Sequence, residues 1–416
     1  MKKLIAVCSV VAALASAATT IEVVSANQRW PWNGLMDVDF TISGSESSMA
    51  YRIELSATYN NGANKVYAKS YLTEPVVEGD GDKRVTWDLG ADCPELKADD
   101  FSVTVTATPL VGNDIPVYMV IDLSSGPSSA KYPVRYTTTP PDLSDDTCRT
   151  TEMWLRRIKA GVFKMGGANG GATGISTLSP AKDITLTKDF YMAVFETTQQ
   201  QWHQVMGTWP SFRTNLNHRA TRPVEQITRD DIRGPLWVSS GTAYRWPEDG
   251  HVAAPDSFVG RMQSRIGMSR FDLPTEAQWE YACWAGKHDS PPDATLGRFS
   301  ENGGNDNPDD RNADASSATA KVGSYLSNAW GLYDMFGNVW EIVLDRWKES
   351  SWPDEVVNDY GGPSNAQGGA TGDVVVKSQS CTWGAWYGAR QYRRNNNFSG
   401  NYKSRNCGAR FCVTLD

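Results

Sequence analysis

Apolar and polar residues alternate with a period of two in several short runs between residues 19 and 125. The alternation is clear at 21–24, 36–42 and 101–106, and clusters of Gly, Asn, Asp and Ser separate the runs. Because successive side chains of a strand point to opposite faces of a sheet, this pattern predicts half-buried β-strands. Short strands at regular spacing favour an all-β sandwich of immunoglobulin-like size over residues 19–125. Since no catalytic pattern occurs there, we expect an accessory module, with carbohydrate or cell-surface binding as the alternative.

The chain begins Met-Lys-Lys, an apolar run follows over residues 4–14, and the small triplet Ala-Ser-Ala stands at 15–17. This arrangement is typical of a secretory signal peptide, so we expect residues 1–17 to be removed by cleavage near Ala17. A buried N-terminal helix is the alternative, because the apolar run is too short to span a bilayer. No later segment has 18 consecutive apolar residues. The sequence therefore predicts a secreted, periplasmic or cell-envelope protein without a transmembrane segment.

Composition limits the class of protein further. Hydrophobic residues make up 40% of the 416 positions and charged residues 21%, which excludes a disordered or collagen-like chain. The net charge of −8 argues against a nucleic-acid binder that is basic throughout. Only four His occur, which argues against a His-rich metal site or a zinc protease.

Export would also set the chemistry of the cysteines. Six remain once Cys8 is removed with the signal peptide: Cys93, Cys148, Cys283, Cys381, Cys407 and Cys412. An even number in an oxidising compartment favours disulfide bonds, although the sequence does not choose among the pairings. No Cys-x-x-Cys occurs, which excludes a zinc ribbon or a thioredoxin-like motif.

Residues 126–148 are rich in Ser, Thr, Gly and Pro, and they predict a linker to a second domain over 149–416. Within that domain, 198–207 and 275–282 each begin with Thr and carry Gln three residues later. This spacing predicts a capping box and a short helix in both places. Residues 331–341 have no helical or strand period, and we expect a structured loop that leads into a strand.

Seven short blocks of the second domain follow one another in a recognisable order. They are 160–166, 189–191, 196–198 with Trp202, 222–225, 271–282, 331–341 and 408–411. The ordered set resembles the sulfatase-modifying-factor family, the formylglycine-generating enzymes, over roughly 260 residues. The resemblance implies an α+β, C-type-lectin-like fold that is rich in loops, and it does not cover the first 150 residues or so.

The family's oxidase chemistry uses two cysteines five positions apart, whose thiolates hold Cu(I) because soft sulfur suits that ion. The resemblance places the first thiol three residues after the stretch 377–380, which reads Lys-Ser-Gln-Ser here. The two expected thiol positions are therefore Trp383 and Gly388, and Cys381 lies two residues too early. The pocket positions Ser380, Tyr387 and Trp340 match the oxidases. We expect neither copper nor oxidase activity, with Cys381 as a single copper ligand being the alternative.

The resemblance further implies a structural Ca²⁺ in the loop 331–341. Its ligands would be the Asp334 side chain, the carbonyl oxygens of Gly337 and Val339, and Glu341, which are donor types that Ca²⁺ prefers. The alternative is that Asp334 caps a turn and Glu341 pairs with an arginine. A second family site falls at 302–314, where we expect a solvated acidic loop.

The C-terminal segment, residues 374–415, holds seven basic residues and no acid, so that the rest of the chain carries −15. Aromatic and Asn residues lie among the basic ones, and these residue types are common in binding surfaces. The segment resembles the variable region of lectin-fold ligand binders that retroelements diversify. The predicted ligand-binding residues are Trp383, Trp386, Tyr387, Tyr392, Arg393 and Asn397. The alternative is that the arginines pair within the domain and the aromatics form its core.

These observations favour a secreted, non-catalytic protein that binds an exported protein, a peptide or an acidic glycan rather than nucleic acid. The alternatives are a formylglycine-generating oxidase that acts on a cysteine of exported sulfatases, and a structural protein of the cell envelope.

Overall fold

The computed structural model describes residues 19–415 apart from several gaps. The gaps are 30–33, 46–48, 73–74, 95, 97, 99, 111–115, 168–179, 235–252, 287–293, 306, 308–309, 347–357, 362–373, 386–393 and 396–402. The predicted signal peptide thus lies outside the described residues. The chain divides into two compact units, one made of residues 1–117 with 136–139 and the other of 118–135 with 140–416.

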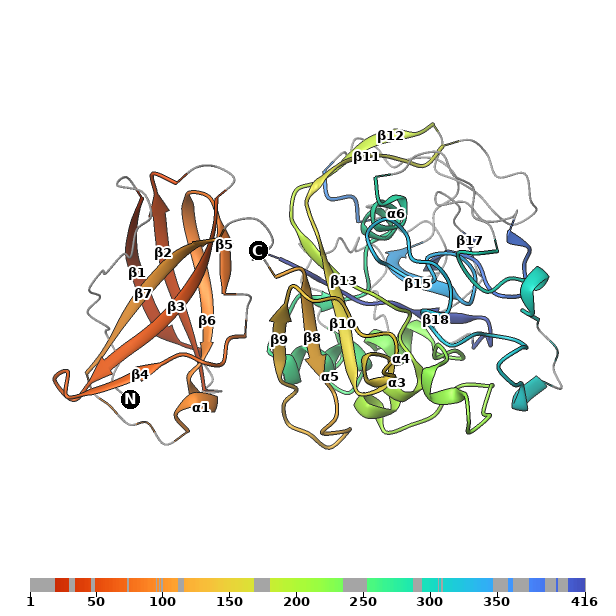
Figure 1. Cartoon of the computed structure of the whole chain (residues 1–416), viewed down its shortest axis with the longest axis horizontal. Helices are drawn as coiled ribbons and strands as arrows, with labels where there is room; N and C mark the ends of the chain where they lie inside the picture. The colour runs from red at the N-terminus through yellow and green to blue at the C-terminus, as the bar shows by residue number, and fades with distance from the viewer. Residues whose placement is uncertain are drawn as a thin grey trace, which may run out of the picture. The chain divides into compact units, whose positions relative to one another are not determined.

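The first unit consists of two antiparallel sheets around one core (Figure 1). One sheet has the order β1-β2-β6, with β1 at Thr20–Gln28, β2 at Leu35–Ser43 and β6 at Gly81–Asp88. In the other, β3 (Ala50–Tyr59) pairs along its whole length with β7 (Phe101–Leu110), and also with β4 (Asn64–Tyr67) and β5 (Val76–Glu78). A single turn, α1 (Leu89–Asp92), follows β6. Buried and more exposed residues alternate along β2 and β7, as the period of two predicts.

The described residues of the second unit form three sheets. The largest has the order β14-β19-β13-β10-β8-β9, with bounds Phe271–Asp272, Cys412–Thr414, Phe190–Ala193, Glu152–Ile158, Tyr118–Asp122 and Val134–Thr137. A two-stranded sheet pairs β11 (Gly161–Met165) with β12 (Lys182–Leu186). The third has the order β17-β16-β15-β18, with bounds Arg394–Asn395, Val374–Lys377, Trp340–Arg346 and Cys407–Ala409.

Short helices join these strands. They are α2 (Thr147–Thr150), α3 (Gln199–Met206), α4 (Arg229–Arg233), α5 (Phe258–Ile266) and α6 (Glu276–Trp284), with 3₁₀ turns η2 (Arg219–Thr221), η3 (Ser300–Asn302) and η4 (Asp310–Asn312). Thr198 with Gln201 and Thr275 with Gln278 form the two predicted capping boxes, which satisfy backbone N–H groups at the starts of α3 and α6. The mixture of sheets and short helices makes the fold α+β. None of the helices among the described residues is long and apolar enough to cross a membrane.

Between residues 118 and 148, the division of the structure into two units differs from the predicted domain and linker boundaries. Strand β8, which the sequence analysis assigned to the first domain, pairs with β10 in the second unit. Four of its five residues are buried, so the strand lacks the alternation that marks a solvent-facing sheet. The predicted linker also packs onto the second unit, because Tyr132 is buried and its hydroxyl lies 2.8 Å from the Gln204 carbonyl oxygen. The segment's content of Ser and Pro predicts a linker, and it gives no sign that Tyr132 is buried.

Replacing Tyr132 with Phe should lower the free energy of unfolding by about 1–3 kcal/mol. The change removes the acceptor that receives a 2.6 Å hydrogen bond from Arg265 Nη1 and the donor to the Gln204 carbonyl oxygen, and both bonds are part-buried. Urea denaturation of the full chain measures the loss. Tyr67→Phe, at an exposed tyrosine, is the control and should change stability by less than about 0.5 kcal/mol. Equal effects of the two variants would contradict the anchoring role.

Candidate functional site

Three loops meet at one end of the sheet that contains β15. Strands β15 and β18 run parallel and start opposite each other at Trp340 and Cys407. Strand β16 runs the other way, with Lys377 at its end opposite Glu341. The loops before β15, after β16 and before β18 therefore lie at the same edge. We call these loops, residues 331–339, 378–385 and 403–406, the loop end.

The sequence predicts a set of pocket, thiol, calcium-ligand and ligand-binding positions. Seven of them have described positions at the loop end or in the first two residues of β15. They are Asp334, Gly337, Val339, Trp340, Glu341, Ser380 and Trp383. The other residues named as pocket, thiol or ligand-binding positions lie outside the described residues: Trp386, Tyr387, Gly388, Tyr392, Arg393 and Asn397.

Glu341 and Arg410 form a buried ion pair beneath the loop end. Both side chains are 0% exposed, and Arg410 Nη2 lies 2.8 Å from Glu341 Oε1. The indole of Trp279 donates to Glu341 Oε2 at 2.7 Å. Arg410 also donates to the carbonyl oxygens of Ala193, Val194 and Tyr333. Although burial opposes it, the Glu341 carboxylate raises the pKa of Arg410. The pair joins the two larger sheets to the loop before β15.

Two further carboxylates are buried beside this pair. Glu196 accepts hydrogen bonds from Asn338 Nδ2 at 2.7 Å and from the Val339 N–H at 3.1 Å. Asp334 Oδ2 accepts from the Gly323 N–H at 2.6 Å, whereas Oδ1 is buried without a hydrogen-bond partner. Burial and the charges of Asp334 and Glu341 raise the pKa of Glu196 well above its usual range. Burial is also the main cause that raises the pKa of Asp334 to about 6.

The predicted calcium ligands fit this geometry only in part. The Asp334 Oδ1 atom has no hydrogen-bond partner and is a suitable donor. Glu341 does not fit, because Arg410 and Trp279 already occupy both of its carboxylate oxygens. Among the described residues, no group of three or more His, Cys, Asp or Glu is placed to hold a metal ion. The geometry thus favours the alternative of an ion pair and a turn cap, and a calcium site here stays a prediction.

Lys377 is also buried, at the end of β16. Its Nζ lies 2.9 Å from Glu280 Oε2 and 3.4 Å from Glu276 Oε1, and both carboxylates belong to α6. Burial raises the pKa of Glu280, although the Lys377 charge opposes this rise. Two of the seven basic residues of the C-terminal segment, Lys377 and Arg410, are therefore internal ion-pair partners and do not belong to a binding surface. For these two residues the structure matches the alternative of pairing within the domain, and their partners lie far away in the sequence.

The first expected thiol position holds an aromatic pair. The ring of Trp383 packs edge-on against Trp340, with 6.3 Å between ring centroids. Nearby, the buried Ser380 hydroxyl lies 2.7 Å from the Thr382 hydroxyl. Cys381 is buried, and its Sγ lies 3.8 Å from the carbonyl oxygen of Asn305.

The six cysteines that remain after the predicted cleavage are all described, and none forms a disulfide bond. The structure therefore differs from the disulfide prediction. Cys93 lies in the first unit and the other five in the second. Burial raises the pKa of Cys148 and raises that of Cys412 well above the usual range, which favours the less nucleophilic thiol form of both.

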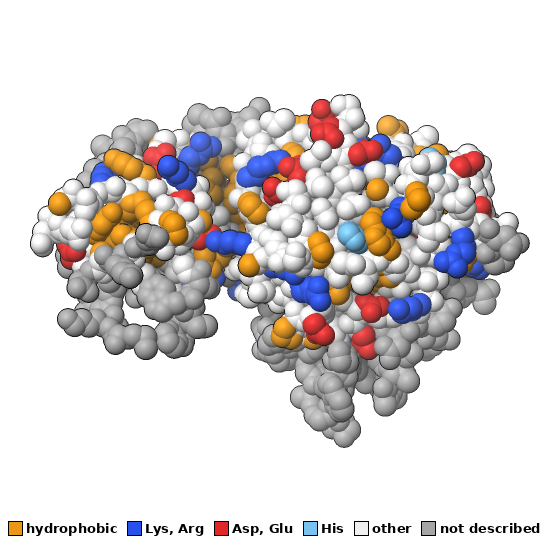
Figure 2. Space-filling model, turned by 90° about the horizontal axis from the view of Figure 1, so that it is seen from below, with side chains coloured by type: hydrophobic (Ala, Val, Ile, Leu, Met, Phe, Trp, Pro, Cys, Tyr) orange, Lys and Arg blue, Asp and Glu red, His pale blue; other side chains and the backbone are white. Residues whose placement is uncertain are grey.

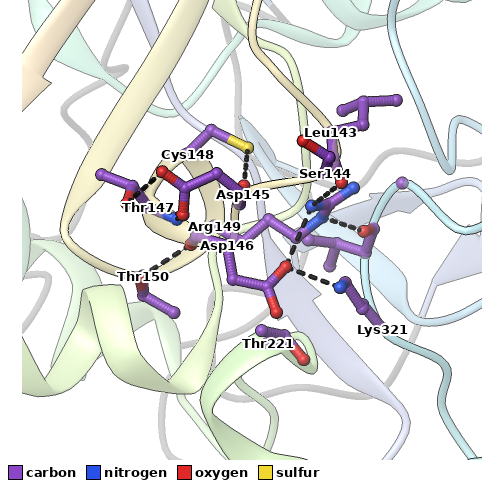
Figure 3. A network of polar contacts seen from close by, with 12 residues as sticks. Leu143, Ser144, Asp145, Asp146, Thr147, Cys148, Arg149, Thr150, Thr221 and Lys321 are labelled. Carbon is purple, nitrogen blue, oxygen red and sulfur yellow. Dashed lines mark hydrogen bonds and ion pairs between the residues drawn. The ribbon is translucent and has the colours of Figure 1, made fainter.

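Arg149 connects α2 to the loop that contains Gly323, whose N–H donates a hydrogen bond to Asp334. Its guanidinium donates to the carbonyl oxygens of Val322 and Leu143 and pairs with Asp146 at 3.0 Å (Figure 3). Lys321 lies 2.6 Å from the same Asp146 carboxylate. Gly323 is the residue after Val322, and its N–H donates to Asp334. This network therefore holds the loop before β15 from outside the sheet.

The surface that is described near residues 203–219 and 403–405 combines cations with aromatic rings. The Phe212 ring has Arg311 at 5.3 Å and Arg405 at 5.1 Å from its centroid. Arg219 lies 3.9 Å from the Trp209 centroid, and His203 stacks on that ring at 4.6 Å. On the face shown in Figure 2, Lys and Arg side chains are mixed with acidic ones and do not form one continuous patch.

Sequence reasoning missed Glu196 and the partner of Glu341. Glu196 lies in one of the seven blocks, two residues before the Thr198 cap, but nothing local shows that its carboxylate is buried against Asn338. Arg410 also lies in an identified block. The one signal that could have paired it with Glu341 is that each is a charged residue in a largely apolar block.

Comparison with known proteins identifies the class to which this fold and site belong. The family model described as the sulfatase-modifying factor enzyme 1-like domain matches residues 141–411. The chain therefore belongs to this family, and the match contains every loop of the loop end.

Individual relatives are more distant. The chain is 29% identical over 209 residues to a protein named chaperone protein LppX from Paenibacillus barcinonensis, which covers 43% of this chain and 69% of that one. It is 26% identical over 247 residues to the formylglycine-generating enzyme of Bos taurus, covering 50% of this chain and 62% of the enzyme. The chain thus spans about three fifths of that enzyme's length. Among solved structures, Treponema denticola variable protein 1 aligns with a TM-score of 0.46 at 19% identity, covering 64% of this chain and 96% of the other.

Proposed function

We propose that this protein is an exported ligand-binding member of the family that lacks copper-dependent oxidase activity. The observation that carries the proposal is Trp383, which occupies the first expected thiol position and packs against Trp340. Position 388 is Gly, so the pair of sulfurs that would hold Cu(I) is missing from both expected places. Cys381 lies outside both expected positions, against a backbone carbonyl.

The binding surface in this proposal is the C-terminal segment together with the loops that lie against it. Arg405 belongs to that segment and contributes to the stack on Phe212, and Trp383 remains partly exposed. Aromatic rings combined with guanidinium groups supply contact area and orientation at little entropic cost, which suits a protein, peptide or acidic glycan ligand. The predicted residues Trp386, Tyr387, Tyr392, Arg393 and Asn397 would extend this surface.

The proposal includes several finer expectations. The signal peptide at residues 1–17 would direct export, and the first unit would be an immunoglobulin-like accessory module. The second unit would have the C-type-lectin-like topology of its family. The formylglycine-generating oxidase is the second candidate, favoured by the similarity to the bovine enzyme and by the retained Ser380 and Trp340.

Copper loading separates the two candidates. Protein loaded with Cu(I) and incubated with a cysteine-containing sulfatase peptide under oxygen should form no aldehyde, because the two thiols are missing. Mass spectrometry of the peptide measures the product, and a Cu(I) competition titration measures the affinity. The double variant Trp383→Cys with Gly388→Cys restores both thiols and should bind Cu(I) much more tightly than the natural chain. Tight stoichiometric binding with aldehyde formation by the natural chain would overturn the proposal.

A further inference from the structure

Three buried arginines lie close together behind the loop end. Arg213 follows α3, Arg222 follows η2 and Arg298 precedes η3, and their exposed fractions are 0%, 1% and 6%. Burial, followed by the charges of Arg213 and Arg298, lowers the pKa of Arg222 to about 10. The positive charges of Arg213 and Arg298 therefore act on Arg222, and all three side chains are largely shielded from solvent.

The groups that bind these guanidiniums are neutral. Arg213 donates to the carbonyl oxygens of Arg405 at 2.6 Å and Asn305 at 3.1 Å. Arg222 donates to those of Asp314 and Ser317. Arg298 donates to three more, which belong to Asn302, Ala315 and Ser316. Among the described residues, no carboxylate lies within ion-pair distance of any of the three arginines.

Several guanidinium N–H groups also lack an acceptor. They are the Nε groups of Arg213, Arg222 and Arg298 and the Nη1 group of Arg222, all buried and without a hydrogen-bond partner. Leaving a buried donor of a charged group unpaired is costly, and an uncompensated buried cation costs more. Water would satisfy the hydrogen bonds but not the charge.

Three acids, Glu225, Asp310 and Asp314, act on the cluster through space, but none of them forms an ion pair with it. Glu225 is buried, but its oxygens accept from the N–H groups of Phe212 and Arg213, and burial raises its pKa to about 7. It is therefore only partly ionised at neutral pH. Asp310 raises the pKa of Arg222, yet its carboxylate accepts a hydrogen bond from Ser317. The Cys381 thiol also acts on Arg222 when it is ionised.

We propose that Arg213, Arg222 and Arg298 form an oxyanion site that neutralises an acidic group of the ligand bound at the loop end. Guanidinium groups present several fixed donors that match the oxygens of a carboxylate, sulfate or phosphate group. Arg213 connects the cluster to the surface, because it donates to the backbone of Arg405, whose side chain stacks on Phe212. The inference rests on the proposed ligand-binding function for the identity of the ligand but not for the presence of the site.

Inorganic phosphate tests the site in the full-length protein. Thermal unfolding in increasing phosphate, with chloride at matched ionic strength, should show a saturable rise in midpoint of roughly 3–6 °C. A general salt effect of phosphate is not saturable at millimolar concentration, so the shape of the curve separates the two causes. Parallel titrations with sulfate and acetate distinguish a tetrahedral anion from a carboxylate as the preferred group.

Arg222→Met should abolish the saturable rise. The control is Arg135→Met, which removes an arginine whose side chain is 50% exposed and paired with Glu152, and it should keep the rise. If Arg222→Met does not fold, calorimetric titration of the natural chain decides the question. No saturable heat with phosphate, sulfate or acetate up to about 10 mM would overturn the proposal. If the protein binds phosphate and also forms aldehyde when loaded with Cu(I), the proposed function is wrong. The proposed oxyanion site is then still supported.

Discussion

Replacing Glu341 with Gln should lower the free energy of unfolding by about 3–5 kcal/mol, because it leaves Arg410 as a buried cation without its counter-charge. The pair is 0% exposed on both sides, so solvent does not screen it. The three carbonyl oxygens that bind Arg410 keep the guanidinium hydrogen-bonded but do not neutralise it. Urea or guanidinium denaturation of the full chain, followed by circular dichroism, measures the change.

The control for this variant is Asp183→Asn, which breaks the exposed ion pair between Asp183 and Lys164. Their side chains are 63% and 62% exposed, and the loss should be below about 1 kcal/mol. A double-mutant cycle with Arg410→Met adds a second check. The double variant should be more stable than the sum of the two single losses predicts, because no unpaired charge remains.

The same variant separates the ion pair from the predicted calcium site. If Glu341 serves Arg410, Glu341→Gln destabilises the protein equally in EDTA and in millimolar Ca²⁺, and this is the result we expect. A loss that occurs only in Ca²⁺ would show that Glu341 is a metal ligand, and the ion-pair interpretation would then be wrong.

Local features of the fold could be predicted from the sequence where they depend on neighbouring residues. The capping boxes of α3 and α6 need only a Thr and a Gln three positions apart, and both are present. The period of two in β2 and β7 likewise follows from which side chains face the core. The loop 331–339 was expected because its residues match no regular period, and in the structure Asp334 and Asn338 adopt left-handed backbone angles there.

The site was harder to predict because its partners are far apart in the chain. Glu341 and Arg410 are separated by 69 positions, and Glu196 and Asn338 by 142. No sequence period connects them, since the sheet topology alone brings them together. The same reason applies to Lys377, whose partners lie on α6, about 100 positions earlier.

Replacing Asp334 with Asn should remove a pH-dependent loss of stability. Burial raises the pKa of Asp334 from 3.8 to about 6, so the folded state holds this proton more tightly than the unfolded state does. Its contribution is favourable at low pH and is lost as the pH rises from about 4 to about 6. The expected cost above pH 6 is about 3 kcal/mol, at 1.36 kcal/mol per pKa unit.

Asn is the appropriate replacement because it preserves the other properties of the position. Asp334 has a φ of 54°, which Asn tolerates better than most residues. Its side-chain oxygen can still accept from Gly323. The difference in unfolding free energy between Asp334→Asn and the natural chain, measured by calorimetry in EDTA, should therefore shift by about 3 kcal/mol in favour of the variant between pH 4 and pH 7. Asp334→Ala should lose stability at every pH, because it removes the acceptor and strains the left-handed backbone. A constant difference between Asp334→Asn and the natural chain would mean that Asp334 is ionised in the folded state at pH 4, as a bound cation would require.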